Sequence, residues 1–267
     1  MTDIMTPHEA ASPVLAARGL TRRFGGVVAL DHLDLDVSHG EIVGLIGPNG
    51  SGKTTFFNVV TGIYAADSGH VSLDGTDITR ASAQAIYHAG VSRTFQRSRL
   101  SLPLSIFDNI MIGNHKRLKQ GLWFNLVNRR AFRTEFEANY AEAKSLVAVF
   151  DFPLTERMME PVGSLPMIDR RRIEICRALI SRPKLLLLDE PSAGMTHDET
   201  AQLMDDILEV RARLGSLTIV IVEHEMGVIE RITDRCVVLN FGRKIAAGTF
   251  AEIANDRQVQ EAYLGLQ

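Results

Sequence analysis

The stretch GPNGSGKT, from Gly47 to Thr54, decides the fold of this 267-residue chain. It matches the pattern G-x-x-x-x-G-K-[ST]. The apolar run EIVGLI before it predicts a strand buried on both faces, and TFFNVV after it predicts a helix. A glycine-rich turn with no special role is the alternative, but a strand before the pattern and a helix after it are the context in which it binds phosphate.

Each part of this loop suits a phosphate group. Glycines allow the backbone to wrap the anion, so that successive N–H groups and the helix N-terminus face its charge. Lys53 would reach the outer phosphates of a nucleotide, and the hydroxyl of Thr54 would ligate Mg²⁺. The residues expected to hold the phosphates are Gly47, Pro48, Asn49, Gly50, Ser51, Gly52, Lys53, Thr54 and Thr55.

A pair of carboxylates follows a second predicted strand. Four leucines, from Leu185 to Leu188, predict a short buried strand, and Asp189 and Glu190 emerge at its end. Two solvated acids after a core strand are the alternative when these residues are taken alone. Beside a phosphate loop, Asp189 suits the Mg²⁺ shell, and Glu190 suits a general base that polarises the attacking water.

Three further side chains are candidates on weaker grounds. His224 ends the predicted strand LTIVIVE, where a neutral imidazole could contact the outermost phosphate and the attacking water. Gln96 leads from the core into a helical region, and its side-chain carbonyl could join the Mg²⁺ or water shell. Phe24 precedes the phosphate loop and could stack on adenine. A structural histidine and a core phenylalanine are the alternatives.

The rest of the chain predicts an α/β fold with two additions to the core. The alternating run ALDHLDLDV and the turn signal Asp74-Gly75 predict an antiparallel β lobe. Helical periodicity dominates residues 98–163, which predicts an inserted α-helical subdomain. The expected fold is therefore a RecA-like P-loop NTPase core with both additions. The expected boundaries are a flexible tail at 1–13, a nucleotide-binding domain at 14–253 and a C-terminal tail at 254–267.

Composition excludes several classes of protein. The net charge of −3 gives no basic signature of a nucleic-acid binder. Cys176 and Cys236 lie in apolar patterns, which indicates reduced core residues of a cytosolic protein, and no His/Cys spacing suggests zinc. No apolar run approaches the ~18 residues of a membrane span. We therefore expect any link to a membrane to go through a partner.

Taken together, these residues resemble the ATP-binding subunits of ABC transporters. Phe24, the Gly47–Thr54 loop, Gln96, Asp189-Glu190 and His224 match that family's A-loop, Walker A, Q-loop, Walker B with catalytic Glu, and H-loop, in this order. The likeness covers about residues 14 to 265. Within the family it is nearest to the branched-chain amino acid importers, through LTRRFGGVVAL, EPSAGM, VEHEM, VVLNFGRKIAAGT and a long insert near GNHKRLKQGLWFNLVNRRAF.

The resemblance implies an ATPase that uses ATP and Mg²⁺ to energise an importer for branched-chain amino acids or related amides and amino acids. It implies a second ATP-binding chain, integral membrane permease subunits and, indirectly, a periplasmic substrate-binding protein. It also implies a cytoplasmic location on the inner face of the cell membrane. The alternatives are a motor for lipopolysaccharide-type export, a soluble ABC ATPase acting on DNA or ribosomes, and a P-loop small-molecule kinase.

One motif of the family departs from its usual form. The family's signature loop, usually L-S-G-G-Q, closes on the ATP of the other chain, and LPMID, Leu165 to Asp169, occupies its place. Pro166 removes a hydroxyl donor and an N–H, Ile168 adds a branched side chain where Gly allows close approach, and Asp169 adds a negative charge near phosphate. Against this, the run Arg170–Arg172 could restore positive potential. The motif predicts a weakened site and a heterodimer, with a tolerated variant as the alternative.

Two other features are singled out by the same likeness. Thr196 stands where the family's D-loop usually has Asp. The insert around Trp123 mixes Lys and Arg with Leu, Trp and Phe, so it could lie near lipid head groups or a membrane subunit. A helical excursion packed on its own subdomain, with a solvated basic face, is the alternative.

Overall fold

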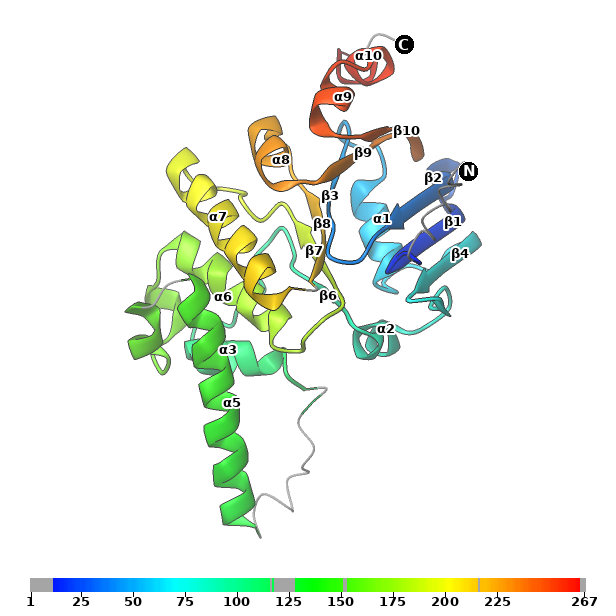
Figure 1. Ribbon diagram of the computed structural model, residues 1–267. Coiled ribbons are helices and arrows are strands. Elements are labelled where there is room, and N and C mark those ends of the chain that lie inside the picture. The colour runs from blue at the N-terminus through cyan, green and yellow to red at the C-terminus, as the bar shows by residue number, and fades with distance from the viewer. Residues whose placement is uncertain (1–11, 116, 118–127, 151–152, 216, 265–267) are drawn as a thin grey trace, which may run out of the picture.

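The computed structural model describes residues 12–115, 117, 128–150, 153–215 and 217–264. Most of the predicted N-terminal tail, and the part of the insert that contains Trp123, lie outside the described residues. Within the described part, two β-sheets, a helix between them and a group of helices on one side form the molecule (Figure 1). The α/β fold predicted from the sequence is confirmed.

A six-stranded sheet forms the core, in the order β10-β9-β3-β8-β7-β6. Its five strands from β9 to β6 run parallel, and β10 pairs antiparallel with β9. The carboxyl ends of parallel strands meet at one edge, so the segments that follow β3, β6, β7 and β8 lie near one another. The strands are β3 (Ile42–Ile46), β6 (Val91–Arg93), β7 (Leu185–Asp189), β8 (Thr218–Val222), β9 (Arg235–Asn240) and β10 (Arg243–Gly248).

The predicted antiparallel lobe is a second sheet, with the order β2-β1-β4-β5. Helix α1 (Lys53–Val60) lies between the two sheets, and Phe56 and Phe57 are fully buried in a core that both sheets share. This packing fixes the N-terminus of α1 at the edge where β3 ends. The strands of this sheet are β1 (Leu15–Phe24), β2 (Val27–Val37), β4 (Ser68–Leu73) and β5 (Thr76–Asp77).

Helices account for the regular structure described between residues 98 and 163, where the sequence predicts an insert. Helix α5 extends well beyond the body of the molecule (Figure 1). Phe107 and Val147 are buried in the core that α3, α5 and α6 share with the six-stranded sheet. The elements here are α3 (Ile106–Ile112), α5 (Arg129–Phe150), two 3₁₀ turns (Pro153–Arg157 and Val162–Ser164) and, just after the insert, α6 (Met167–Leu179).

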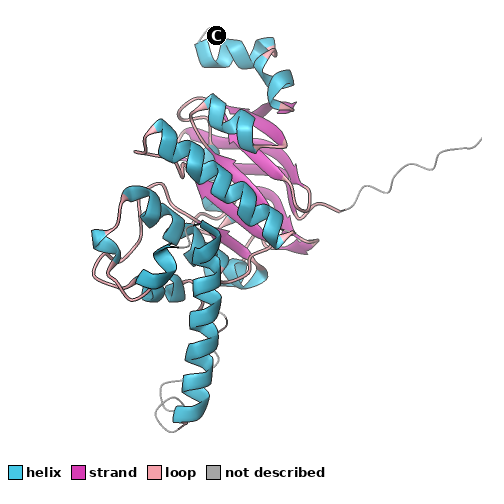
Figure 2. Cartoon of the chain, turned by 60° about the vertical axis from the view of Figure 1, so that its left-hand side comes forward, coloured by secondary structure: helices cyan, strands magenta, loops and turns pink. Residues whose placement is uncertain are grey.

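The remaining helices complete the cover of the sheets. Leu203 and Ile207 of α7 pack with residues of the six-stranded sheet, and Figure 2 shows this helix lying across the sheet. Cys176 and Cys236 are buried free thiols, as predicted, and burial raises the pKa of both. None of the described helices is long and apolar enough to cross a membrane. These helices are α2 (Ala83–Ala89), α7 (His197–Leu214), α8 (Met226–Ile232), α9 (Phe250–Ala254) and α10 (Arg257–Leu264).

Candidate functional site

The phosphate loop joins β3 to α1 through backbone conformations that only glycine adopts easily. Gly47 has φ 142°, and a Cβ there would lie 2.1 Å from the carbonyl oxygen of Leu239. Gly52 has φ 110°, and a Cβ there would lie 2.6 Å from the carbonyl oxygen of Ala29. Gly47 and Gly52 are therefore required by close packing against neighbouring strands as well as by the turn itself.

The side chains of this loop are positioned for an anion. The Nζ of Lys53 donates to the carbonyl oxygens of Gly47 and Pro48, at 2.6 and 3.0 Å. Burial lowers the pKa of Lys53, while the nearby carboxylates of Glu190 and Asp189 raise it. The Ser51 hydroxyl is buried and has no hydrogen-bond partner within the described structure. A buried ammonium group and an unsatisfied hydroxyl suit a phosphate, which would supply acceptors to both.

A cavity of about 150 Å³ lies between this loop and the ends of two core strands. The loop contributes one wall, and Glu190 and His224, which follow β7 and β8, contribute the other. The structure thus places two of the predicted catalytic side chains opposite the predicted phosphate loop. The lining residues are Asn49, Gly50, Ser51, Gly52, Lys53, Thr54, Thr55, Glu190 and His224.

Glu190 contacts the side chains of two other predicted site residues, Gln96 and His224. Its Oε2 accepts a hydrogen bond from Nε2 of Gln96 at 2.5 Å, and its Oε1 lies 2.8 Å from Nε2 of His224. The backbone of Glu190 has φ 46°, an uncommon conformation for a residue with a side chain. The contacts hold both carboxylate oxygens in defined directions.

Asp189 is paired with a residue that the sequence reasoning missed. Arg93, at the end of β6, donates to Oδ2 of Asp189 at 2.6 Å and to Oδ1 of Asn58 at 2.7 Å. Both side chains of the ion pair are almost fully buried. A charged residue three positions before Gln96, at the point where the chain leaves the core, was the available signal, because buried charges are normally paired.

Glu223 is a second missed residue, directly before His224. It is buried, and its Oε1 accepts a hydrogen bond from the backbone N–H of Ser192 at 2.8 Å. Burial raises the pKa of Glu223, and the hydrogen bonds from Ser192 and from the His224 backbone lower it. This carboxyl group ties the segment after Glu190 to the end of β8, and so supports both catalytic candidates.

Phe24 stands apart from the cavity at the phosphate loop. It ends β1, and its ring is 39% exposed, which excludes a core phenylalanine. The ring meets that of Tyr64 edge to face at 5.1 Å, and the guanidinium of Arg22 lies 4.7 Å from its centre. An exposed ring held in this way remains available to stack on a planar ligand.

The segment Leu165–Asp169 differs from what its sequence suggests. Ile168 and Asp169 are both only 8% exposed, and Oδ1 of Asp169 accepts a hydrogen bond from Arg172 at 3.1 Å. They fall in the first turn of α6, whose register turns them towards the protein. Met167 is 49% exposed, so the surface of the segment is formed by Met167 and Pro166. The branched side chain of Ile168 is thus buried, and the negative charge of Asp169 is paired within the chain.

Thr196 has a local structural role at the start of α7. Its hydroxyl accepts a hydrogen bond from the backbone N–H of Glu199, and the Glu199 carboxylate accepts one from the backbone N–H of Thr196. This reciprocal arrangement is a capping box, which satisfies backbone donors at the start of a helix.

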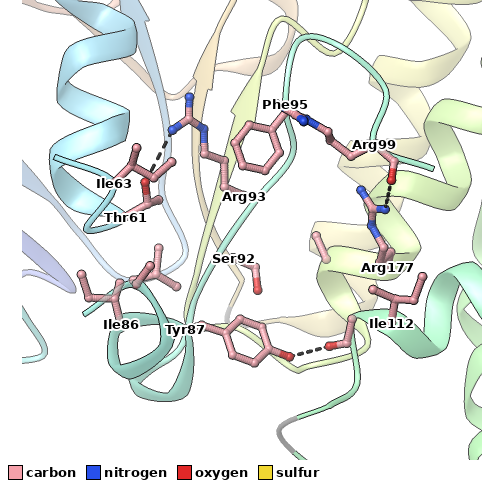
Figure 3. Close-up of a pocket in the computed structure, with 14 residues that line it drawn as sticks. Thr61, Ile63, Ile86, Tyr87, Ser92, Arg93, Phe95, Arg99, Ile112 and Arg177 are labelled. Atoms are coloured by element: carbon pink, nitrogen blue, oxygen red, sulfur yellow. Dashed lines mark hydrogen bonds between the residues drawn. The ribbon is translucent and has the colours of Figure 1, made fainter. Parts of the chain in front are cut away.

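A larger hollow of about 480 Å³ lies beside the segment that carries Gln96 (Figure 3). Tyr87 of α2 forms part of its floor and donates to the carbonyl oxygen of Gly113 at 2.5 Å. Phe95 and Ile112 add apolar walls, and Arg177 lines it on the side of α6. The segment that carries Gln96 thus forms part of the wall of this hollow, through Phe95 and Arg99.

Comparison with known proteins is consistent with this geometry. Residues 30–193 match the ABC transporter family model, and residues 243–265 match that of the branched-chain amino acid ATP-binding cassette transporter. The chain is 39% identical over 256 residues to the high-affinity branched-chain amino acid transport ATP-binding protein LivG of Salmonella typhimurium, covering 96% of this chain and 99% of LivG. It is 38% identical to BraF of Pseudomonas aeruginosa, a protein with the same descriptive name, covering 95% and 98%.

Solved structures resemble the chain over a similar extent. The crystal structure of the ADP conformation of MJ1267, an ATP-binding cassette of an ABC transporter, is 29% identical, with a TM-score of 0.81. The match covers 95% of this chain and 99% of MJ1267. The family match, the relatives and the phosphate loop facing Glu190 agree with one another. The chain therefore belongs to the ABC transporter family, as an ATP-binding and ATP-hydrolysing member.

Proposed function

We propose that this chain is the motor subunit of an importer for branched-chain amino acids or related amides and amino acids. The observation that carries this proposal is the likeness to LivG and BraF over nearly the whole of each protein. It extends past the ATP-binding core to the C-terminal match at residues 243–265. This second match separates the branched-chain group from ABC ATPases in general.

Hydrolysis in this proposal depends on the carboxylate of Glu190. It acts as a general base towards a water beside the phosphates, and the imidazole of His224, whose Nε2 lies 2.8 Å from Oε1 of Glu190, orients the carboxylate. The backbone of the phosphate loop, the Nζ of Lys53 and the Ser51 hydroxyl hold the phosphates opposite that water. For this, Lys53 would exchange its two carbonyl partners for phosphate oxygens.

Mg²⁺ would be held by oxygen atoms of Thr54, Asp189 and Gln96. Hydroxyl, carboxylate and amide oxygens are hard ligands of the kind that Mg²⁺ takes, and Thr54 and Gln96 flank Glu190. When bound, the ion would neutralise charge on the phosphates. Arg93 holds one oxygen of Asp189 and thereby fixes the direction of that carboxylate.

A second ATP-binding chain, a copy or a relative, would complete the site. Helix α6 begins at Met167 without a side-chain cap on its N-terminus, and the exposed Pro166 and Met167 lie beside that end. In the proposed dimer this end faces ATP bound to the other chain. Since Ile168 and Asp169 are buried, the exposed Pro166 and Met167, which stand where the usual motif has Ser and Gly, are the remaining reasons to expect a weakened signature side.

Permease subunits would dock near the hollow beside the Gln96 segment (Figure 3). Its apolar walls, Phe95 and Ile112, suit a protein partner, and its position would link the partner to Gln96. The proposed location is the cytoplasmic face of the cell membrane, reached through the permeases, with a periplasmic binding protein as an indirect partner.

The test is uptake in cells that lack this chain. Deletion should reduce uptake of labelled leucine, isoleucine or valine severalfold. The wild-type gene should restore it, and a Glu190→Gln variant should not. If uptake of all three is unchanged but uptake of an amide or an aromatic acid is reduced, the proposed substrate would be wrong and the role as a transport motor would stand. Unchanged uptake of every candidate would contradict the transport proposal.

A further inference from the structure

The segment that carries Gln96 has little regular structure of its own. The described chain from the end of β6 at Arg93 to the start of α3 at Ile106 contains no helix or strand. Yet the side chain of Gln96 must be placed accurately, because its Nε2 donates to Glu190 at 2.5 Å. Something outside the segment has to hold its backbone.

Helix α6 supplies that support through two buried side chains one turn apart. Arg171 and Glu174 form an ion pair of 2.7 Å, and each side chain is nearly inaccessible to solvent. Burial makes such charge-assisted contacts stronger than the same contacts on a surface. The pair therefore forms a rigid element on the face of α6 that meets the Gln96 segment.

Both members of the pair bind the backbone of the segment. Arg171 donates to the carbonyl oxygens of Phe95 and Gln96, at 3.2 and 3.3 Å. Glu174 accepts a hydrogen bond from the backbone N–H of Arg99 at 2.8 Å. Arg171 thus holds the start of the stretch Phe95–Arg99, including the backbone of Gln96 itself, and Glu174 holds its end.

We propose that Arg171 and Glu174 are positioning residues that clamp the Gln96 segment to α6 and thereby set the contact of Gln96 with Glu190. The same helix carries Pro166 and Met167 at its N-terminus, where the other chain is proposed to bind. Movement of that end is then transmitted through the clamp to Gln96. This inference rests on the proposed role of Glu190. It adds a mechanical link between the N-terminus of α6 and the contact of Gln96 with Glu190.

The first test is Arg171→Lys. Lysine keeps the positive charge beside Glu174 but lacks the planar fork that reaches two carbonyl oxygens. Hydrolysis of saturating Mg-ATP should fall about tenfold in kcat, with KM for ATP within about twofold, because the loss is in orientation and not in binding. The matched control is Arg235→Lys, in which an arginine that also binds a carboxylate and a backbone carbonyl lies away from the segment. Its kcat should equal that of the wild type.

Combining the variant with Gln96→Ala separates positioning from general structural damage. If Arg171 acts through Gln96, then Arg171→Lys should change kcat by less than about twofold in the Gln96→Ala background. An equal tenfold loss in both backgrounds would overturn the proposal, and so would a normal kcat in the single variant. If the wild type itself fails to hydrolyse ATP, that result would count against the proposed function. The contacts of Arg171 and Glu174 with the Gln96 segment would then be tested by amide hydrogen exchange alone.

Amide hydrogen exchange tests the clamp without any catalytic readout. In the nucleotide-free chain, the amide of Arg99, which donates to Glu174, should exchange at least about tenfold faster in Arg171→Lys than in the wild type or in Arg235→Lys. Glu174→Gln should produce a smaller increase that is strongest near Arg99, and it serves in place of Arg171→Lys if that variant fails to fold. Unchanged exchange in the folded variants would overturn the proposal.

Discussion

The phosphate loop and the segment Leu165–Asp169 differ in what determines their form. In the loop, Gly47 and Gly52 adopt backbone conformations that exclude other residues, and a Cβ at either would overlap a neighbouring strand. In the second segment, an ordinary helix begins at Met167, and Ile168 and Asp169 turn inward. The strained, closely packed positions of the loop disfavour any residue except glycine, whereas the first turn of a helix accepts new side chains at positions that face the protein.

The largest effect should come from the chemistry that the phosphate loop faces. Glu190→Gln removes the general base but keeps a side chain of the same shape, so kcat should fall by about 10³-fold while ATP affinity is retained. Phosphate release and ATP binding measure the two quantities. Size-exclusion chromatography of this variant with Mg-ATP then tests the opposite side, because a homodimer that depends on ATP requires a working Leu165–Asp169 segment. A kcat within tenfold of the wild type would remove Glu190 from the proposed role.

Gly47→Ala should have the next largest effect. Its new Cβ would lie 2.1 Å from the Leu239 carbonyl oxygen, so the loop or the strand must move. We expect the free energy of unfolding to fall by about 3 kcal/mol and ATP affinity to fall at least about tenfold. Gly50→Ala is the matched control, because Gly50 also has a positive φ but open space around it, and it should cost only about 1 kcal/mol. Urea denaturation and nucleotide titration measure both, and equal effects at the two positions would contradict the packing argument.

Restoring the family's usual residues in the segment Leu165–Asp169 should not improve hydrolysis. Since Ile168 is buried, Ile168→Gly should lower the free energy of unfolding by about 3 kcal/mol and give no gain in hydrolysis. Asp169→Gln should likewise bring no gain, because it leaves Arg172 without one of its carboxylate partners. Denaturation curves and ATPase rates for each variant provide the measurement. Faster hydrolysis in either variant would show that these side chains do face the other chain's ATP.

The same contrast explains how far the sequence could predict the structure. The phosphate loop, the acids after β7 and the strands around them follow from local pattern, because strained glycines and apolar runs leave their mark at fixed spacings. Arg93 and Glu223 were missed because their partners, Asp189 and Ser192, are distant in sequence, and only the folded chain shows the pairs. The direction of Asp169 could not be read either, since it depends on the register of α6 against the rest of the protein.

The smallest effect concerns the buried carboxyl of Glu223, which supports the segment after Glu190, opposite the phosphate loop. Burial raises its pKa above the ordinary value of 4.5, so the folded protein binds this proton more tightly than the unfolded chain does. Its contribution to stability is complete below pH 4.5 and is lost as the pH rises through the raised pKa. Glu223→Gln cannot titrate, so the stability of the variant relative to the wild type should increase as the pH rises from 4 to 7. Urea denaturation at several pH values measures this difference. A difference that does not change with pH would mean that the hydrogen bonds from Ser192 and His224 offset the effect of burial, and a difference that falls as the pH rises would mean that they outweigh it.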